Sequence, residues 1–254
     1  ASRQKAQQLS RAGKVRLGDA VLDKPGHEIS LEAVPEVTLP PRFVSRGGEK
    51  LAAALESLPV QVEGRCCLDA GISTGGFSDC LLQHGASRIY GIDVGYGQTA
   101  WSLRQDPRVV LRERTNLRHL TPEDLYGPGD PQPDLAVADL SFISLARVLE
   151  PMQGLLAGGP QAEAVLLVKP QFEVGRERVG KGGVVRDPKA HADAIALVAA
   201  AAEPLQWFPQ GLVESPITGA AGNHEYLLWL GPKAELDSSA WTALIEQVVQ
   251  RTNA

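Results

Sequence analysis

A lysine and an aspartate each stand at the end of an apolar run, where reactive side chains can leave a sheet. Lys169 follows AVLLV at 164–168 and precedes Pro170, and Asp139 closes DLAVAD at 134–139. An ammonium is costly to bury unless it emerges at the strand end, and proline stiffens the chain just after it. If the two runs are neighbouring parallel strands, both side chains lie at one edge of the sheet. The pair then suits acid–base chemistry; the alternatives are an ion pair that only stabilises the fold and a carboxylate that caps a turn.

A glycine-rich turn before a predicted helix offers a second chemical site. Gly71, Gly75 and Gly76 follow an apolar run, and glycine lets the backbone turn tightly and approach a ligand closely. Asp93 ends the next apolar run, 22 residues after Gly71, where a carboxylate accepts hydrogen bonds from ribose hydroxyls. The spacing is G-x-x-x-G-G rather than the dinucleotide G-x-G-x-x-G, and Asp69 would repel a pyrophosphate. A positively charged cofactor such as S-adenosylmethionine (SAM) fits better, and the alternative is a plain structural turn.

Short apolar runs alternate with helical stretches from about residue 45 onward, and these predict the elements that carry the reactive residues. Runs this apolar belong to a sheet that is covered on both faces. We therefore predict an α/β fold with a parallel sheet and a site at the carboxyl ends of its strands. The expected strands are 65–71, 87–95, 108–114, 134–142, 164–170 and 225–230, and the expected helices are 48–58, 77–85 and 187–203.

The N-terminal segment follows a different pattern. Residues 2–13 predict a short helix, with Ser2 as its cap. Residues 14–26 predict two short strands joined by a Gly-Asp turn. The proline-rich stretch at 35–44 predicts an extended linker.

The charge is distributed unevenly. Residues 1–24 carry six Lys/Arg and two Asp on a chain whose net charge is −5, which predicts a basic binding arm. From Gly175 to His191, five Lys/Arg stand against two acids among mobile glycines, which predicts an RNA clamp. A solvated surface is the alternative for both. The predicted RNA-binding residues are Arg3, Lys5, Arg11, Lys14, Arg16, Arg46, Arg176, Arg178 and Lys181.

The composition is that of a globular protein, with 43% hydrophobic and 22% charged residues. The longest apolar helical stretch, 194–202, is too short to span a bilayer, and no signal peptide is visible. Cys66, Cys67 and Cys80 form no CxxC pair. We therefore expect buried reduced thiols in a cytoplasmic protein, without a metal site or a disulfide framework.

Seven motifs give the chain a resemblance to a known family. They run from VSRGGEKLAAALE at 44–56 through LDAGISTGGFSDCLLQHGA, GIDVGYGQ, DPRVVLRERTN, DLSFISL and VKPQFEVGRERVGKGGVVRDP to SPITGAAGNHEYLL at 215–228. Together they resemble the TlyA family of SAM-dependent ribosomal-RNA 2′-O-methyltransferases, some of which are also named hemolysins. The resemblance implies a Rossmann-like, FtsJ-like methyltransferase domain at 45–254. Residues 2–26 resemble the later part of an S4 RNA-binding domain, which implies an incomplete S4-like α+β domain at 1–34 and a linker at 35–44.

FtsJ-like enzymes use a Lys-Asp-Lys-Glu tetrad, which the resemblance places on Lys50, Asp139, Lys169 and Glu225. We assign Lys169 as the base that takes the ribose 2′-hydroxyl proton and Asp139 as its orienting partner, while Lys50 and Glu225 position the ribose. A lysine of ordinary pKa, about 10.4, is neutral roughly one time in a thousand near pH 7.4, so its surroundings matter. The resemblance makes cytidines of 16S and 23S rRNA the expected targets. The implied SAM contacts are Asp69, Gly71, Ser73, Thr74, Gly75, Gly76, Asp93, Gly95, Asn116 and Asp139.

Three other functions compete with this one. The first is a membrane-active hemolysin, which the family's second name suggests. The second is a SAM-dependent enzyme that acts on a small molecule, against which the tetrad and the S4-like arm both count. The third is an RNA-binding protein with an inactive methyltransferase domain, which the complete tetrad disfavours.

Overall fold

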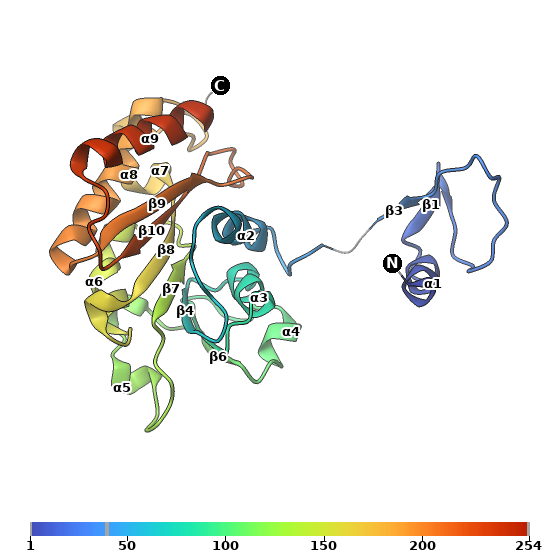
Figure 1. The fold of residues 1–254 in the computed structure, drawn as a ribbon, viewed down its shortest axis with the longest axis horizontal. Coiled ribbons are helices and arrows are strands. Elements are labelled where there is room, and N and C mark those ends of the chain that lie inside the picture. The colour runs from blue at the N-terminus through green and yellow to red at the C-terminus, as the bar shows by residue number, and fades with distance from the viewer. Residues whose placement is uncertain (1, 39–40, 253–254) are drawn as a thin grey trace. The chain divides into compact units, whose positions relative to one another are not determined.

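The computed structural model describes residues 2–38 and 41–252. The chain divides into two units, Ala1–Arg42 and Phe43–Ala254 (Figure 1). In the described residues no helix combines the length and the apolar character that crossing a membrane requires.

The first unit is one helix with a small antiparallel sheet in the order β2-β1-β3. The hydroxyl of Ser2 accepts a hydrogen bond from the backbone N–H of Lys5, so the predicted cap is confirmed. The predicted hairpin is also present, with Gly18 in the left-handed region at φ 57°. Part of the expected linker instead pairs with β1 as a third strand. The elements are α1 (Arg3–Arg11), β1 (Val15–Leu17), β2 (Ala20–Val21) and β3 (Glu36–Val37).

The second unit is built on a seven-stranded sheet in the order β6-β5-β4-β7-β8-β10-β9, which confirms the predicted α/β fold. The first five strands of that order are parallel, and β10 runs antiparallel to both β8 and β9. The late strand thus departs from a purely parallel sheet, because a direct connection from β9 folds it back as an antiparallel neighbour. The strands are β4 (Cys66–Ala70), β5 (Arg88–Ile92), β6 (Val109–Arg112), β7 (Leu135–Ala138), β8 (Glu163–Val168), β9 (Phe208–Glu214) and β10 (Tyr226–Gly231).

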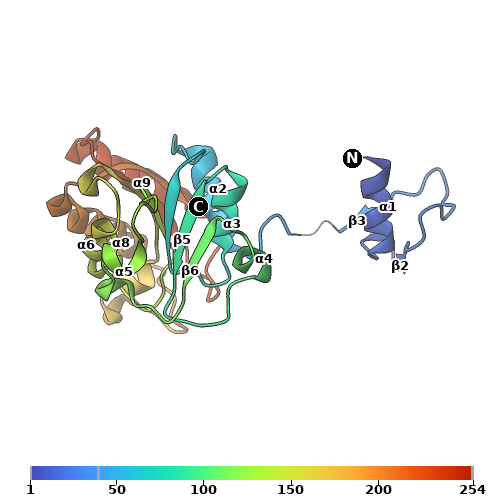
Figure 2. The ribbon, with the colours of Figure 1, turned by 90° about the horizontal axis from the view of Figure 1, so that it is seen from below.

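Helices cover both faces of this sheet, and Figure 2 shows α2 and α3 on one side of it with α6 and α8 on the other. The α-helices are α2 (Gly47–Ser57), α3 (Gly76–Gln83), α4 (Trp101–Arg104), α5 (Pro122–Leu125), α6 (Leu149–Gly154), α7 (Pro170–Glu173), α8 (Pro188–Ala202) and α9 (Ser238–Thr252). Short 3-10 turns are η1 (Leu117–His119), η2 (Leu145–Arg147), η3 (Gly159–Gln161), η4 (Arg176–Arg178) and η5 (Glu203–Leu205).

The two faces of the sheet bury separate cores. Along β8, Val165 and Leu167 pack with α2 and α3, whereas Leu166 and Val168 pack with α8 and α9. This period of two is the pleat of a strand. The three cysteines are buried, as predicted, and burial raises the pKa of the Cys66 and Cys67 thiols to about 12.

Candidate active site

The strand pleat explains why four residues far apart in sequence meet. Every second side chain of a strand lies on the same face, so Asp139 follows Leu135 and Val137 on the face of the sheet that α2 and α3 cover. Lys169 follows Val165 and Leu167 onto that face in the same way, and Glu225 precedes Leu227 of β10 by two residues. Lys50 comes from the first turn of α2, the helix that covers this face. The sheet and one helix therefore bring together the whole predicted tetrad.

The tetrad forms a chain of alternating charges. Lys169 Nζ lies 2.6 Å from Asp139 Oδ1, and Lys50 Nζ lies 2.5 Å from Glu225 Oε2. Lys50 Nζ is also 4.0 Å from Asp139 Oδ2, which links the two pairs. Lys50 and Lys169 are each 8% exposed and Glu225 is 2% exposed. Buried charges of this kind are tolerated when each has an opposite partner.

Ser141 is a further member of the site that sequence reasoning missed. Lys169 Nζ donates a hydrogen bond to Ser141 Oγ at 2.9 Å. The lysine is thus held from two directions, by a carboxylate and by a hydroxyl, which fixes its position at the end of β8. The sequence feature that could have indicated Ser141 is its position two residues after Asp139, in the DLSF motif.

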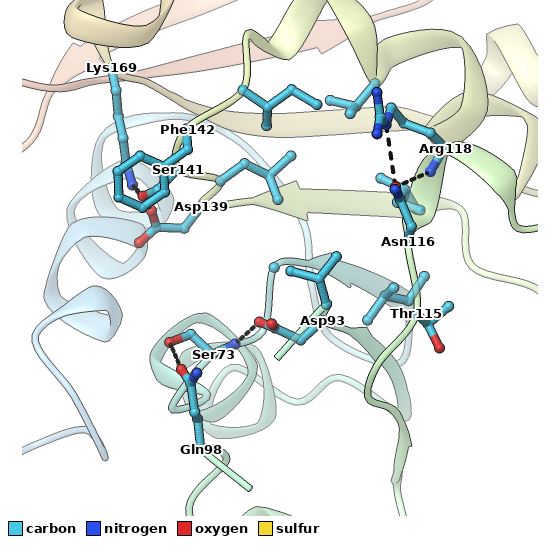
Figure 3. Close-up of a pocket in the computed structure, with 17 residues that line it drawn as sticks. Ser73, Asp93, Gln98, Thr115, Asn116, Arg118, Asp139, Ser141, Phe142 and Lys169 are labelled. Atoms are coloured by element: carbon cyan, nitrogen blue, oxygen red, sulfur yellow. Dashed lines mark hydrogen bonds and ion pairs between the residues drawn. The ribbon is translucent and has the colours of Figure 1, made fainter. Parts of the chain in front are cut away.

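A cavity of about 560 Å³ opens beside this group, a size that suits a small cofactor. Figure 3 shows Lys169, Ser141 and Asp139 on one side of it and Asp93, Ser73 and Gln98 across from them. The predicted residues that line it are Gly71, Ser73, Asp93, Asn116, Asp139 and Lys169. Lining residues that the sequence reasoning missed include Gln98, Thr115, Arg118 and Phe142.

Asp93 lines this cavity and holds the backbone around it through hydrogen bonds. Its Oδ2 accepts a hydrogen bond from the backbone N–H of Ser73 at 2.8 Å, and its Oδ1 accepts one from that of Gly95 at 2.6 Å. Each carboxylate oxygen retains a second lone pair that can accept from a ligand hydroxyl. Asn116 caps η1, where its Oδ1 accepts from the N–H of Arg118 at 3.1 Å.

The remaining predicted cofactor contacts shape the turn around the cavity. Thr74 and Gly76 line a smaller cavity of about 80 Å³ next to Asp139. Gly75, the N-cap residue of α3, has φ 97°, a conformation that favours glycine. Gly71 has φ 84°, and a Cβ there would lie 3.1 Å from the Asp139 carbonyl oxygen, so the turn favours glycine at this position.

Asp69 lies beneath the turn and is completely buried. Its Oδ2 accepts a hydrogen bond from Ser78 Oγ at 2.6 Å, whereas Oδ1 has no partner among the described residues. Burial raises its pKa to about 7, helped by the charges of Asp139 and Asp93 and opposed by Ser78. Asp69 is not among the residues that line either of these cavities, so the structure does not place this predicted contact beside a cofactor.

The predicted RNA-binding residues fall into three groups. The five in the first unit, Arg3, Lys5, Arg11, Lys14 and Arg16, are exposed. Arg46, Arg176 and Lys181 are exposed in the second unit. Arg178 instead forms ion pairs with Asp193 at 2.6 Å and Asp187 at 3.1 Å, so two carboxylates already occupy its guanidinium. In residues 2–38 and 41–252 there is no His/Cys/Asp/Glu group able to hold a metal ion.

Comparison with known proteins gives consistent matches along the chain. Residues 43–232 match the model of the FtsJ-like methyltransferase family. The chain is 49% identical to the 16S/23S rRNA (cytidine-2′-O)-methyltransferase TlyA of Mycobacterium tuberculosis, over 98% of this chain and 91% of that protein. It is 38% identical to Hemolysin A of Brachyspira hyodysenteriae, over 89% and 92% of the two chains. A crystal structure of a Lactococcus lactis protein with a hemolysin name is 43% identical, with a TM-score of 0.77 over 85% of this chain and 100% of that one.

Proposed function

The chain belongs to the FtsJ-like methyltransferase family and to its TlyA branch, and on that premise we propose that it methylates the ribose 2′-oxygen of cytidines in 16S and 23S rRNA. The observation that carries the proposal is the Lys169–Asp139 pair, 2.6 Å apart, on the same cavity as Asp93. Lys169, a candidate base, and Asp93, a candidate acceptor of hydrogen bonds from ribose hydroxyls, thus line the same cavity, which is large enough for a cofactor.

SAM is the methyl donor in this proposal, and the residues present fit it. Asp93 accepts hydrogen bonds from the ribose hydroxyls of the cofactor. The Asp93 carboxylate on this cavity favours a cationic cofactor over an anionic one. Asn116 and Ser73 line the same cavity and complete the cofactor contacts. When bound, SAM supplies a methyl group on a positively charged sulfur.

The chain's own residues then handle the proton and the ribose. Lys169, in its neutral form, accepts the proton of the 2′-hydroxyl as the oxygen takes the methyl group. Asp139 and Ser141 hold the Lys169 amine in place. Lys50, which pairs with Glu225, lies 4.0 Å from the second oxygen of Asp139, and Lys50 and Glu225 together position the ribose.

RNA binding completes the proposal. The segment 1–34 acts as an incomplete S4-like RNA-binding domain, joined by a linker at 35–44 to the methyltransferase domain. Its five exposed basic residues, with Arg46, Arg176 and Lys181, contact rRNA phosphates of ribosomal subunits in the cytoplasm. Arg178 serves mainly as an internal anchor because Asp187 and Asp193 hold it.

The direct test is to incubate the protein with SAM and unmodified ribosomal subunits. Mass spectrometry of the rRNA should then locate 2′-O-methylcytidines. Methylation at a base atom, or none on either subunit, would refute the proposed reaction.

Replacing Asp93 with alanine should weaken SAM binding at least about tenfold, because the change removes a charged acceptor and two backbone hydrogen bonds. Isothermal titration calorimetry without RNA measures this. Glu113→Ala is a matched control, since Glu113 accepts from Gly97 N at 2.7 Å in the same loop but does not line the cavity. Equal SAM affinity in Asp93→Ala and the parent would remove Asp93 from the cofactor site.

Deleting residues 1–24, or neutralising Arg176 and Lys181, should weaken RNA binding and flatten its dependence on salt. Every phosphate that the variant no longer neutralises reduces the slope of log K against log salt by about 0.7–0.9. Filter binding of rRNA fragments at several salt concentrations gives that slope. A slope equal to the parent's in either variant would show that the altered region does not contact phosphates.

A further inference from the structure

Two buried polar residues take no part in the proposed mechanism. Asn223 is 2% exposed and His191 is 1% exposed. A buried polar side chain needs partners, and both residues have partners on the backbone of the glycine-rich segment Gly180–Arg186.

Both backbone groups of Val185, its N–H and its carbonyl, form hydrogen bonds with buried side chains. Its N–H donates to Asn223 Oδ1 at 2.9 Å, and its carbonyl accepts from His191 Nε2 at 2.9 Å. Asn223 Nδ2 also donates to the carbonyl of Gly183 at 2.8 Å. The side chain of Val185 is itself 2% exposed. One end of the segment is therefore fixed by three side-chain hydrogen bonds.

The rest of the segment is a tight turn with backbone hydrogen bonds of its own. Gly180 N donates to Val184 O at 2.9 Å, and Gly183 N donates to Gly180 O at 3.1 Å. Gly182 and Gly183 supply the left-handed conformations that the turn needs, at φ 78° and 77°. Lys181 is exposed within this turn.

Asn223 and His191 are also connected to the chain on either side of Glu225, a member of the tetrad. Asn223 precedes it by two positions, and its carbonyl accepts from Gly219 N at 2.8 Å, which closes the loop before β10. His191 Nδ1 lies 2.7 Å from the hydroxyl of Tyr226, the residue after Glu225. The Lys181 turn is thus attached through Asn223 to the chain two residues before Glu225, and through His191 to the side chain of Tyr226.

We propose that Asn223 and His191 are positioning residues that hold the Lys181 turn in fixed register with Glu225, so that an RNA phosphate bound at Lys181 sets the place of the target ribose. This inference rests on the proposed function. Lys181 supplies the charge for the phosphate, and the two buried side chains supply the rigidity. RNA binding and ribose placement are then coupled through hydrogen bonds rather than through a flexible clamp.

Trypsin tests the attachment without RNA or methylation. Asn223→Ala should speed cleavage after Lys181 about tenfold or more, because losing two hydrogen bonds of about 1 kcal/mol each raises the open population. His191→Asn should act similarly. The shorter asparagine amide can replace Nδ1, which contacts Tyr226, but it does not reach the Val185 carbonyl that Nε2 contacts. His191→Gln, which can place an N–H where Nε2 donates to Val185, should stay near the parent. Unchanged cleavage in both Asn223→Ala and His191→Asn would overturn the attachment.

A double-mutant cycle tests the purpose of the attachment. Lys181→Ala alone should weaken binding of an rRNA fragment about tenfold. Asn223→Ala should cost a similar factor in the parent but almost none in the Lys181→Ala background, because the two act as one unit. Lys14→Ala, in the other structural unit, is the control and should add independently to Asn223→Ala. SAM affinity should stay at the parent value throughout.

Fully additive losses for Asn223→Ala and Lys181→Ala would overturn the positioning role. That result is separate from failure of the proposed function, which would appear as absent 2′-O-methylation by the parent protein. The trypsin and RNA-binding measurements stand in either case. If the alanine variant of Asn223 does not fold, the His191→Asn and His191→Gln pair carries the same cycle.

Discussion

Lys169→Ala should lower single-turnover methylation of saturating RNA about a hundredfold or more, while the fold and SAM binding persist. The proposed base would be missing, and nothing in its place accepts the hydroxyl proton. The fold should survive because Asp139 keeps Lys50 4.0 Å from its second oxygen and its side chain is 24% exposed, so water can replace the missing ammonium. Rapid-quench kinetics with radiolabelled SAM gives the rate, and calorimetry gives the cofactor affinity.

Lys169→Arg separates proton transfer from electrostatics at the same position. A guanidinium keeps the positive charge and the partner Asp139 but does not give up its proton in proteins. We therefore expect it to be nearly as inactive as the alanine variant. Ser141→Ala is the matched control, because it removes one support of the amine, the 2.9 Å hydrogen bond, and leaves the base in place. If Lys169→Arg kept most of the parent rate, Lys169 would be an electrostatic partner, and Lys50 would be the next candidate base.

The strand pattern made much of this site predictable from sequence. Apolar runs that end in Asp139 and Lys169 fix both the strand ends and, through the period of two, the face that each side chain takes. Neighbouring parallel strands then bring the two ends together, as the 2.6 Å contact confirms. The glycine turn and Asp93 were found in the same way, from residues that interrupt or end an apolar run.

Other features depend on contacts that no local pattern encodes. Neither β9 and α9 nor the antiparallel direction of β10 against β8 was predicted from the local pattern, because pairing is decided by the tertiary fold. Asp69 stands next to the glycine turn in sequence, but the pleat of β4 turns its side chain toward Ser78 of α3. The glycines of 180–183 gave no sign that Asn223, 40 residues later than Gly183, donates a hydrogen bond to the Gly183 carbonyl.

Glu225→Ala should both abolish efficient methylation and lower the free energy of unfolding by about 3–5 kcal/mol. Lys50 is 8% exposed and would lose its 2.5 Å partner, keeping only Asp139 at 4.0 Å. A buried charge without a close partner is far more costly than an apolar side chain of the same size. Urea unfolding followed by circular dichroism measures the stability.

Removing both members of this pair distinguishes a structural role from a functional one. In the Lys50→Met/Glu225→Leu double variant no unpaired charge remains, so the unfolding free energy should return to within about 1 kcal/mol of the parent. Methylation should not return, because the double variant lacks the lysine that lies 4.0 Å from Asp139 and the carboxylate that pairs with it, which we propose position the ribose. A stable double variant that methylates rRNA at the parent rate would show that Lys50 and Glu225 serve only the fold. A Glu225→Ala protein as stable as the parent would instead show that Lys50 does not depend on this carboxylate, and the tetrad would reduce to the Lys169–Asp139 pair.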